Sequence, residues 1–134
     1  MHDSNSILVD ASVFLAVILE EPEQEHIVEL FEGKEIVSVG CLPWEVGNAF
    51  SAMLKRKRLS KEDVSKGWSV FESIVWRSLK VNFGDALSLS SKHNIYAYDA
   101  YYLEAAIRHG YPLLSLDLKM KEVGISERLT ILEI

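Results

Sequence analysis

The stretch Ile7–Leu15 constrains the fold more than any other, because its apolar pattern changes period within a few residues. Ile7–Val9 is a continuous apolar run, typical of a strand buried on both faces of a parallel sheet. From Val13 onward the apolar residues recur at helical spacing. Asp10 and Ser12 lie between the two patterns. We therefore expect a buried strand that ends at a carboxylate and turns directly into a helix.

Two interpretations of Asp10 are open at this point. In open α/β sheets, ligands bind at the carboxyl ends of the strands, which is where Asp10 is expected. Aspartate is also a common N-cap, so Asp10 could do no more than begin the helix that follows it.

The rest of the chain alternates strand-like and helix-like segments, with no repeat or linker. This alternation predicts an α/β fold: one domain over residues 1–134, built as a three-layer sandwich with a mainly parallel central sheet and helices on both faces. Besides the first, the expected strands are Glu35–Val39, Leu79–Phe83, Pro112–Leu116 and Leu129–Ile134. The expected later helices are Pro22–Phe31, Leu42–Arg56, Ser60–Trp76, Asp85–His93, one that begins near Tyr98, and Leu118–Val123.

Three further acids occupy positions comparable to that of Asp10. Asp117 follows an expected strand directly, and Glu45 and Asp99 lie in the first turns of expected helices. Taken singly, each can be explained as a cap or as an acid favoured by the helix dipole. In a parallel α/β sheet, however, all four would gather at one end.

Four clustered carboxylates repel one another strongly unless a cation is present. Ligands that are all oxygen atoms select Mg²⁺ or Mn²⁺ over zinc or copper. The chemistry implied is metal-assisted hydrolysis of a phosphodiester by an activated water.

The residues around these acids resemble the four motifs of PIN-domain nucleases. The segments are Val9-Asp10-Ala11-Ser12, Pro43-Trp44-Glu45-Val46-Gly47-Asn48-Ala49, Tyr98-Asp99-Ala100-Tyr101-Tyr102 and Ser115-Leu116-Asp117. They follow in order over essentially the whole chain, which is most similar to small single-domain toxins of the VapC type, ribonucleases paired with an antitoxin.

The resemblance implies a Mg²⁺- or Mn²⁺-dependent endoribonuclease that acts on RNA and has an antitoxin partner. By motif, its catalytic, metal-binding acids would be Asp10, Glu45, Asp99 and Asp117, and Ser12 and Ser115 would orient them through hydrogen bonds. Family members often carry threonine where Ser115 stands, and either hydroxyl can donate. The alternative is a non-catalytic PIN-like module that binds RNA or a protein, although such a decayed site should have lost at least one of the acids.

The charge of the chain, −6 from 20 acids and 14 bases, is not that of a general nucleic-acid binder. The exception is the basic run Lys55, Arg56, Lys57 and Arg58 at the end of an expected helix. Such a run can be a solvated helix end or a set of phosphate contacts, and we expect a contribution to RNA binding.

Composition sets the remaining expectations. No apolar stretch is long enough to cross a membrane, and the single cysteine, Cys41, excludes an internal disulfide, so a cytoplasmic protein is expected. We expect a homodimer, because the helix pair Leu42–Trp76 carries more large aromatic side chains than a short chain buries easily: Trp44, Phe50, Trp68, Phe71 and Trp76. The antitoxin is expected to insert an Arg or Lys into the acidic pocket and to lay an apolar helix on the Val64–Val75 stripe or a neighbouring groove.

Overall fold

The computed structural model describes residues 5–134 and contains a four-stranded sheet in the order β3-β2-β1-β4. Every pair of neighbouring strands is parallel. The strands are β1 (Ser6–Val9), β2 (Glu35–Val39), β3 (Arg77–Leu79) and β4 (Leu113–Leu114). The helices are α1 (Ala11–Ile18), α2 (Gln24–Phe31), α3 (Leu42–Lys55), α4 (Lys61–Ser73), α5 (Phe83–His93), α6 (Ala97–His109) and α7 (Leu118–Ser126).

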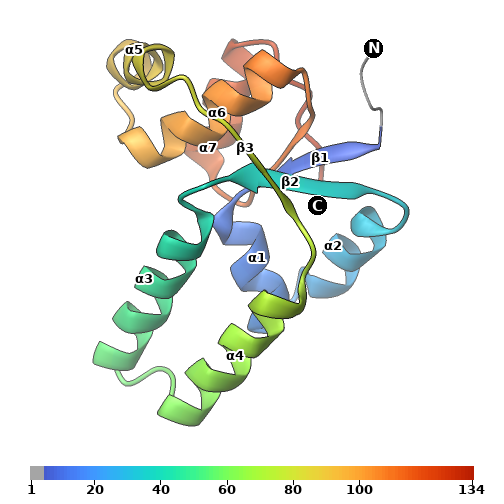
Figure 1. The fold of residues 1–134 in the computed structure, drawn as a ribbon, viewed down its shortest axis with the longest axis vertical. Helices are drawn as coiled ribbons and strands as arrows, with labels where there is room; N and C mark the ends of the chain where they lie inside the picture. Colours follow the sequence, from blue (N-terminus) through green and yellow to red (C-terminus); the bar gives the residue numbers. More distant parts are fainter. Residues whose placement is uncertain (1–4) are drawn as a thin grey trace.

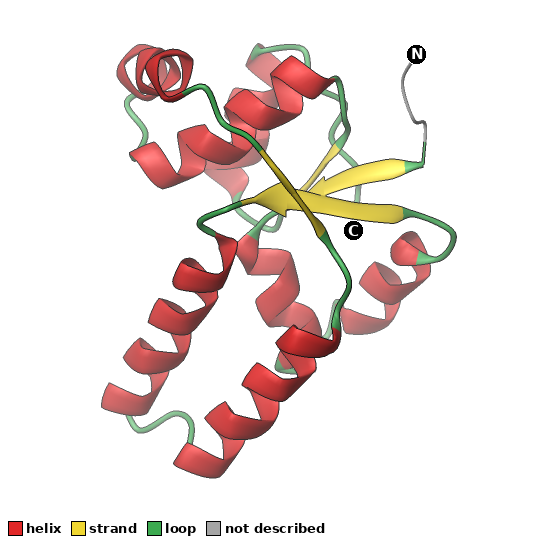
Figure 2. Cartoon of the chain, in the orientation of Figure 1, coloured by secondary structure: helices red, strands yellow, loops and turns green. Residues whose placement is uncertain are grey.

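Helices cover both faces of this sheet, so the predicted three-layer α/β fold is confirmed (Figures 1 and 2). The alternation of side chains along β1 shows the two faces: Ile7 and Val9 pack into a core formed with α1 to α4, and Leu8 packs into a core formed mainly with α6 and α7. Because β1 lies between β2 and β4 and helices pack on both faces of the sheet, all four of its residues are buried, as its continuous apolar run requires.

The long helices α3 and α4 form a hairpin on one side of the sheet, and each has a sequence signal at its start. Pro43 lies in the first turn of α3, where its missing N–H costs nothing. Ser60 and Asp63 form a capping box at the start of α4, since each side chain accepts a hydrogen bond from the other's backbone N–H. A Cβ at Gly67 would lie 2.9 Å from the Phe50 ring, so this glycine permits the close approach of α4 to α3.

Two expected strands are wrong in extent. The apolar alternation of Leu79–Phe83 predicts a strand, but β3 ends at Leu79 because β2, its partner, ends at Val39 in the register that pairs these two residues. Past that point Asn82 caps α5 instead. The expected strand Leu129–Ile134 is reduced to a single bridge between Ile131 and Leu113.

The apolar stripe expected on α4 belongs to the chain's own core over most of its length. Phe71 is buried, with its ring 5.7 Å from that of Phe14, and Val64 and Trp68 pack against the same core. Val75, which lies beyond the end of α4, is 88% exposed. Within residues 5–134, no helix is long and apolar enough to span a membrane.

Candidate active site

Asp10 lies at the carboxyl end of β1 and is the N-cap of α1, where it accepts a hydrogen bond from the backbone N–H of Val13 at 3.3 Å. Both interpretations raised from the sequence therefore apply to its position, but the cap does not account for all its contacts. The Ser12 hydroxyl donates to Oδ1 and the Ser115 hydroxyl donates to Oδ2, each at 2.6 Å. Asp10 is 3% exposed, and burial raises its pKa to about 6 in spite of these three donors, with a smaller contribution from the charge of Asp117.

The two serines also join the beginning of α1 to the segment between β4 and α7. The backbone N–H of Leu116 donates to Ser12 Oγ, and that of Asp117 donates to Ser115 Oγ, both at 3.0 Å. Each hydroxyl thus accepts one backbone hydrogen bond and turns its proton to Asp10. The carboxylate is held in one orientation by groups more than 100 residues apart in sequence.

Asp117 and Glu45 are held by different local contacts. Asp117 is the N-cap of α7 and accepts from the backbone N–H of Met120 at 2.9 Å. Glu45, in the first turn of α3, accepts from the Tyr102 hydroxyl and, at 3.6 Å, from the Cys41 thiol. All these contacts leave the second oxygen of each carboxylate available for other ligands.

Asp99, in the first turn of α6, connects the four acids electrostatically. Burial is the main reason why its pKa is raised to about 6, followed by the negative charges of Asp117 and Glu45. The charge of Asp117 also acts on Asp10. The structure therefore brings all four sequence-predicted acids into one electrostatic group at the carboxyl ends of β1, β2 and β4.

This group has no cation of its own. In the part of the chain from residue 5 onward, the ion pairs all involve other acids, namely Glu29, Glu35, Glu104 and Glu127. Nor do any three acidic, histidine or cysteine side chains among these residues form a ready-made set of metal ligands.

An all-oxygen donor set of this open kind fits Mg²⁺ or Mn²⁺, because Mg²⁺ keeps several waters and is usually held by one or two carboxylates together with substrate phosphates. The buried Asp10, fixed by two hydroxyls but without a counter-charge, is the structural feature that matches such a cation.

The basic run Lys55–Arg58 lies away from these acids. All four residues are exposed and sit at the far end of α3, where that helix turns towards α4 (Figure 1). The rise of an α-helix places Lys55 about 15 Å along the axis from Glu45. These side chains are therefore not part of the acidic site.

Sequence reasoning missed two groups that contact Glu45. The sequence gives no site role to Tyr102 or Cys41, yet both donate to the carboxylate of Glu45. Burial and the charge of Glu45 raise the pKa of the Cys41 thiol to about 12, so it is not a nucleophile. A signal for Tyr102 was present, since it lies three residues after Asp99 and therefore on the same face of α6.

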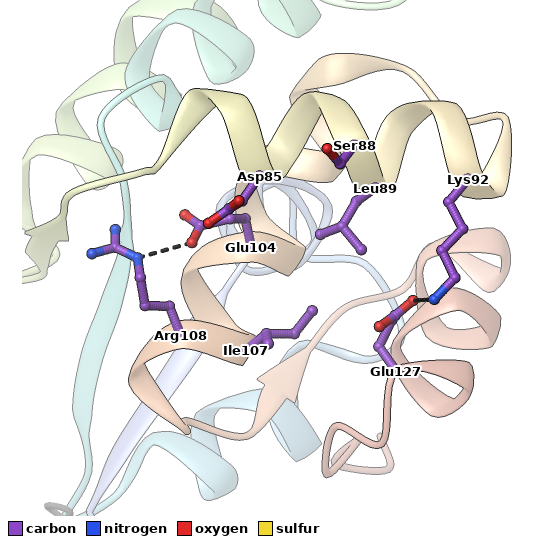
Figure 3. Close-up of a pocket in the computed structure, with 8 residues that line it drawn as sticks. All are labelled: Asp85, Ser88, Leu89, Lys92, Glu104, Ile107, Arg108 and Glu127. Atoms are coloured by element: carbon purple, nitrogen blue, oxygen red, sulfur yellow. Dashed lines mark hydrogen bonds and ion pairs between the residues drawn. The ribbon is translucent and has the colours of Figure 1, made fainter.

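A pocket of about 420 Å³ between α5 and α6 is built differently (Figure 3). Its Glu104 pairs with Arg108 and its Glu127 pairs with Lys92, both at 2.8 Å. Because two of its three acids, Glu104 and Glu127, are paired with cations, this pocket has the character of a structural contact between helices.

Comparison with known proteins agrees with this geometry. The family model described as PIN domain matches residues 7–126. A curated protein of Pyrobaculum aerophilum named Ribonuclease VapC3 is 27% identical over 121 residues, which covers 87% of this chain and 92% of that protein. The crystal structure of PAE2754, also from Pyrobaculum aerophilum, superposes with a TM-score of 0.66 at 20% identity, over 91% of this chain and 81% of the other.

Proposed function

The chain belongs to the PIN-domain family, as its four motifs indicated, and on this premise we propose that it is an endoribonuclease toxin of the VapC type. Its reaction is the metal-dependent hydrolysis of RNA phosphodiester bonds, and the whole chain, residues 1–134, forms the one domain that performs it. The name of its relative, Ribonuclease VapC3, supports this substrate class.

The observation that carries the proposal is the uncompensated charge at the carboxyl end of the sheet. The charge of Asp117 acts on both Asp10 and Asp99, and that of Glu45 acts on Asp99. Asp10 is buried and, within residues 5–134, forms no ion pair. Such an arrangement costs stability, and proteins retain costs of this kind at functional sites. A structural acid is expected to have a counter-charge instead.

Each side chain of the site has a role that follows from its contacts. Asp10, Asp99, Asp117 and Glu45 would hold Mg²⁺ or Mn²⁺. Ser12 and Ser115 keep the two oxygens of Asp10 in fixed directions, and Tyr102 does the same for Glu45. When bound, the cation would neutralise charge on the phosphate and lower the pKa of a water molecule.

Cleavage of RNA by the purified, antitoxin-free protein tests the proposal. A mixed RNA is incubated with Mn²⁺, with Mg²⁺ and with EDTA. The chain offers a matched pair of variants, because Asp99 and Asp85 occupy the same position in the first turns of α6 and α5. Asp99→Asn should lose cleavage and Asp85→Asn should retain it. If no RNA is cut in a chelator-sensitive manner, the proposal fails and the non-catalytic binding module takes its place.

We also propose that Lys55, Arg56, Lys57 and Arg58 contact RNA phosphates. Their exposure and their place at the end of α3 support contacts with nucleotides remote from the cleaved bond. Replacing all four with Ala should flatten the dependence of binding on salt, because fewer counterions are released. An unchanged salt slope would leave them as an ordinary solvated helix end.

The antitoxin that we propose as a partner would neutralise the acids with an Arg or Lys side chain. The support is electrostatic, since four acids without a cation form a strongly anionic pocket. A complex that retained full cleavage, with the four carboxylates open to solvent, would contradict this mode of inhibition.

A homodimer in the cytoplasm is the last part of the proposal. Of the five aromatic residues behind it, Phe50 and Phe71 are buried in the chain's own core, and Trp68 and Trp76 pack against that core. The case for a dimer therefore depends on exposed side chains: Trp44 at 75%, Val70 at 41% and Val75 at 88%. A monomeric mass by light scattering at tens of micromolar would refute it.

A further inference from the structure

A cavity of about 600 Å³ lies beside the acidic site and is lined by aromatic rings. Trp44 comes from the first turn of α3, Phe83 from the first residue of α5, and Tyr98 and Tyr101 from the beginning of α6. Large apolar side chains are seldom left so open to solvent: Trp44 is 75% exposed, Phe83 61% and Tyr98 50%.

Tyr101 fixes two of these rings. Its ring centroid lies 5.2 Å from that of Phe83 and 5.8 Å from that of Tyr98, with interplanar angles of 81° and 88°. Edge-to-face contacts of this kind hold aromatic rings in defined orientations. The aromatic rings that line the cavity are therefore held in fixed orientations.

The cavity wall formed by the connection from β3 to α5 is anchored to α6. Arg108 donates to the backbone carbonyl of Lys80, and the buried Glu104 accepts from the backbone N–H of Asn82 at 2.7 Å. Arg108 and Glu104 are themselves paired (Figure 3). This double attachment holds Phe83 and Lys80 in place relative to α6.

The aromatic cavity borders a second cavity that contains one acid of the site, Glu45. This second cavity, of about 450 Å³, shares two lining residues, Trp44 and Tyr98, with the first. Each of these aromatic residues directly precedes an acid of the site, Glu45 in one case and Asp99 in the other. A ligand that places a phosphate at the acids can therefore extend a neighbouring group between Trp44 and Tyr98.

The charge of the aromatic cavity differs from that of the acidic site. Its lining among the described residues has no acid, and its one cation is the exposed Lys80. An aromatic interior with a cationic rim suits a flat, uncharged ring that is attached to a phosphate.

We propose that this cavity holds an unpaired nucleobase of the RNA in contact with the rings of Phe83, Tyr98 and Trp44, while the adjacent phosphate lies at the four acids and Lys80 contacts the next one. The inference rests on the proposed function, because the RNA is the substrate named there. Bases stack on aromatic side chains with little regard to sequence, and single-stranded RNA presents its bases for such contacts. The site thereby selects unpaired over duplex RNA.

Binding measured at low salt in Ca²⁺, a cation that binds carboxylate oxygens and so neutralises the acids, separates this inference from cleavage when gels show that the probes stay intact. The probes are fluorescently labelled single-stranded (U)12 and (A)12 and an abasic 12-mer that keeps the phosphates. Phe83→Leu and Tyr98→Leu retain apolar bulk but remove the flat ring. Each should weaken binding of at least one base-containing probe by about 5- to 150-fold, the range for stacking of one base, and leave the abasic probe unaffected.

Two control variants complete the experiment. Tyr96→Leu removes a tyrosine that is 86% exposed and outside the cavity lining, and it should bind all probes as the wild type does. Lys80→Ala should weaken base-containing and abasic probes alike, with a salt slope reduced by about one.

Three results would overturn the inference: no binding of either base-containing probe by the wild type, equal losses on base-containing and abasic probes in the ring variants, or no loss at all. The last is expected if a protein partner occupies the cavity. Cleavage in Mn²⁺ decides the proposed function independently, since a wild type that cuts RNA while the ring variants bind normally refutes the base site alone.

Discussion

Two acids at opposite ends of the sheet have different surroundings and therefore pKa values that are shifted in opposite directions. Glu35, at the amino end of β2, accepts a hydrogen bond from Ser6 at 2.7 Å and forms an ion pair with Arg77 at 2.9 Å. Asp10, at the carboxyl end of β1, accepts from Ser115 at 2.6 Å but forms no ion pair within the part of the chain that the structure describes. The pKa of Glu35 is lowered to about 2, mainly through Arg77, whereas burial raises that of Asp10 to about 6.

The comparison shows that a hydrogen bond from a serine hydroxyl does not decide whether the pKa of the carboxyl group is raised or lowered, because both carboxylates accept one. Burial does not decide it alone either. Glu104 is only 4% exposed, yet Arg108 supplies its counter-charge. What distinguishes the carboxyl end of the sheet is the combination of burial with the lack of an ion pair among residues 5–134, which supports the proposed cation site.

The largest effect is expected from Asp10→Asn, which removes the charge but keeps the shape. RNA cleavage in Mn²⁺ should fall by at least about 100-fold, because a metal-binding oxygen is lost. In EDTA at pH 7 the amide nitrogen cannot accept from its serine hydroxyl, so one hydrogen bond is lost, but a buried charge is also gone. The melting temperature should therefore equal or slightly exceed that of the wild type. Retention of cleavage, or a clearly lower melting temperature in EDTA, would equate Asp10 with an ordinary structural cap.

The stability of the metal-free protein should depend on pH in the direction that a raised pKa dictates. Asp10 titrates near 6 when folded and near 3.8 when unfolded, so the folded state holds the proton more tightly. Stability in EDTA should therefore decrease as pH rises from 3.8 to about 6, by up to about 3 kcal/mol at roughly 1.4 kcal/mol per pKa unit.

Urea unfolding at pH 4.5, 5.5 and 7 measures this slope. Asp10→Asn should make it shallower without abolishing it, because Asp99 is shifted in the same direction. Equal slopes in the wild type and the variant would show that Asp10 is not the buried titrating group.

Ser115→Ala tests whether cleavage depends on the orientation of the Asp10 carboxylate as well as on its charge. It leaves the charge of Asp10 in place but removes the donor to Oδ2. Loss of a group that orients a metal ligand typically costs 10- to 100-fold in metal affinity or activity, and we expect a reduction of that size in cleavage. The matched change at the other end of the sheet, Ser6→Ala, should leave cleavage unchanged, and a loss there would contradict the comparison.

Glu104→Gln should have the opposite effect on stability from Asp10→Asn. Glu104 is already paired, so neutralising it weakens its bond to Arg108 and should destabilise the protein by about 1–3 kcal/mol, the value of hydrogen bonds to charged groups. Urea unfolding of the two variants at pH 7 provides the comparison. If both shifted stability in the same direction, the missing cation would not be what sets Asp10 apart.

The smallest effect is expected from Glu35→Gln. The pair of Glu35 with Arg77 is exposed, and such pairs contribute little because solvent screens them. Since the folded pKa of Glu35 is lowered, its contribution is present above about pH 4.5 and disappears as pH falls towards 2, where variant and wild type should coincide. Cleavage should be unchanged, and any substantial loss would count against a purely structural role.

Strands and helix starts could be predicted from the sequence where the pattern depends only on neighbouring residues. The run Ile7–Val9 predicts the central strand, and Ser60 with Asp63 predicts the start of α4, because apolar alternation and capping depend on neighbouring residues. The strand expected at Leu79–Phe83 was wrong because β3 pairs only as far as β2 extends. No residue within that segment carries this information.

The sequence by itself determined which acids stand at strand ends and helix starts, since those positions follow from local periodicity. Only the tertiary structure decided what each acid contacts. Ser115 donates to Asp10 across 105 residues, and Tyr102 donates to Glu45 across 57. Burial, charge coupling and the absence of a counter-cation arise from such long-range contacts, because they depend on which surfaces the packed helices and strands bring together.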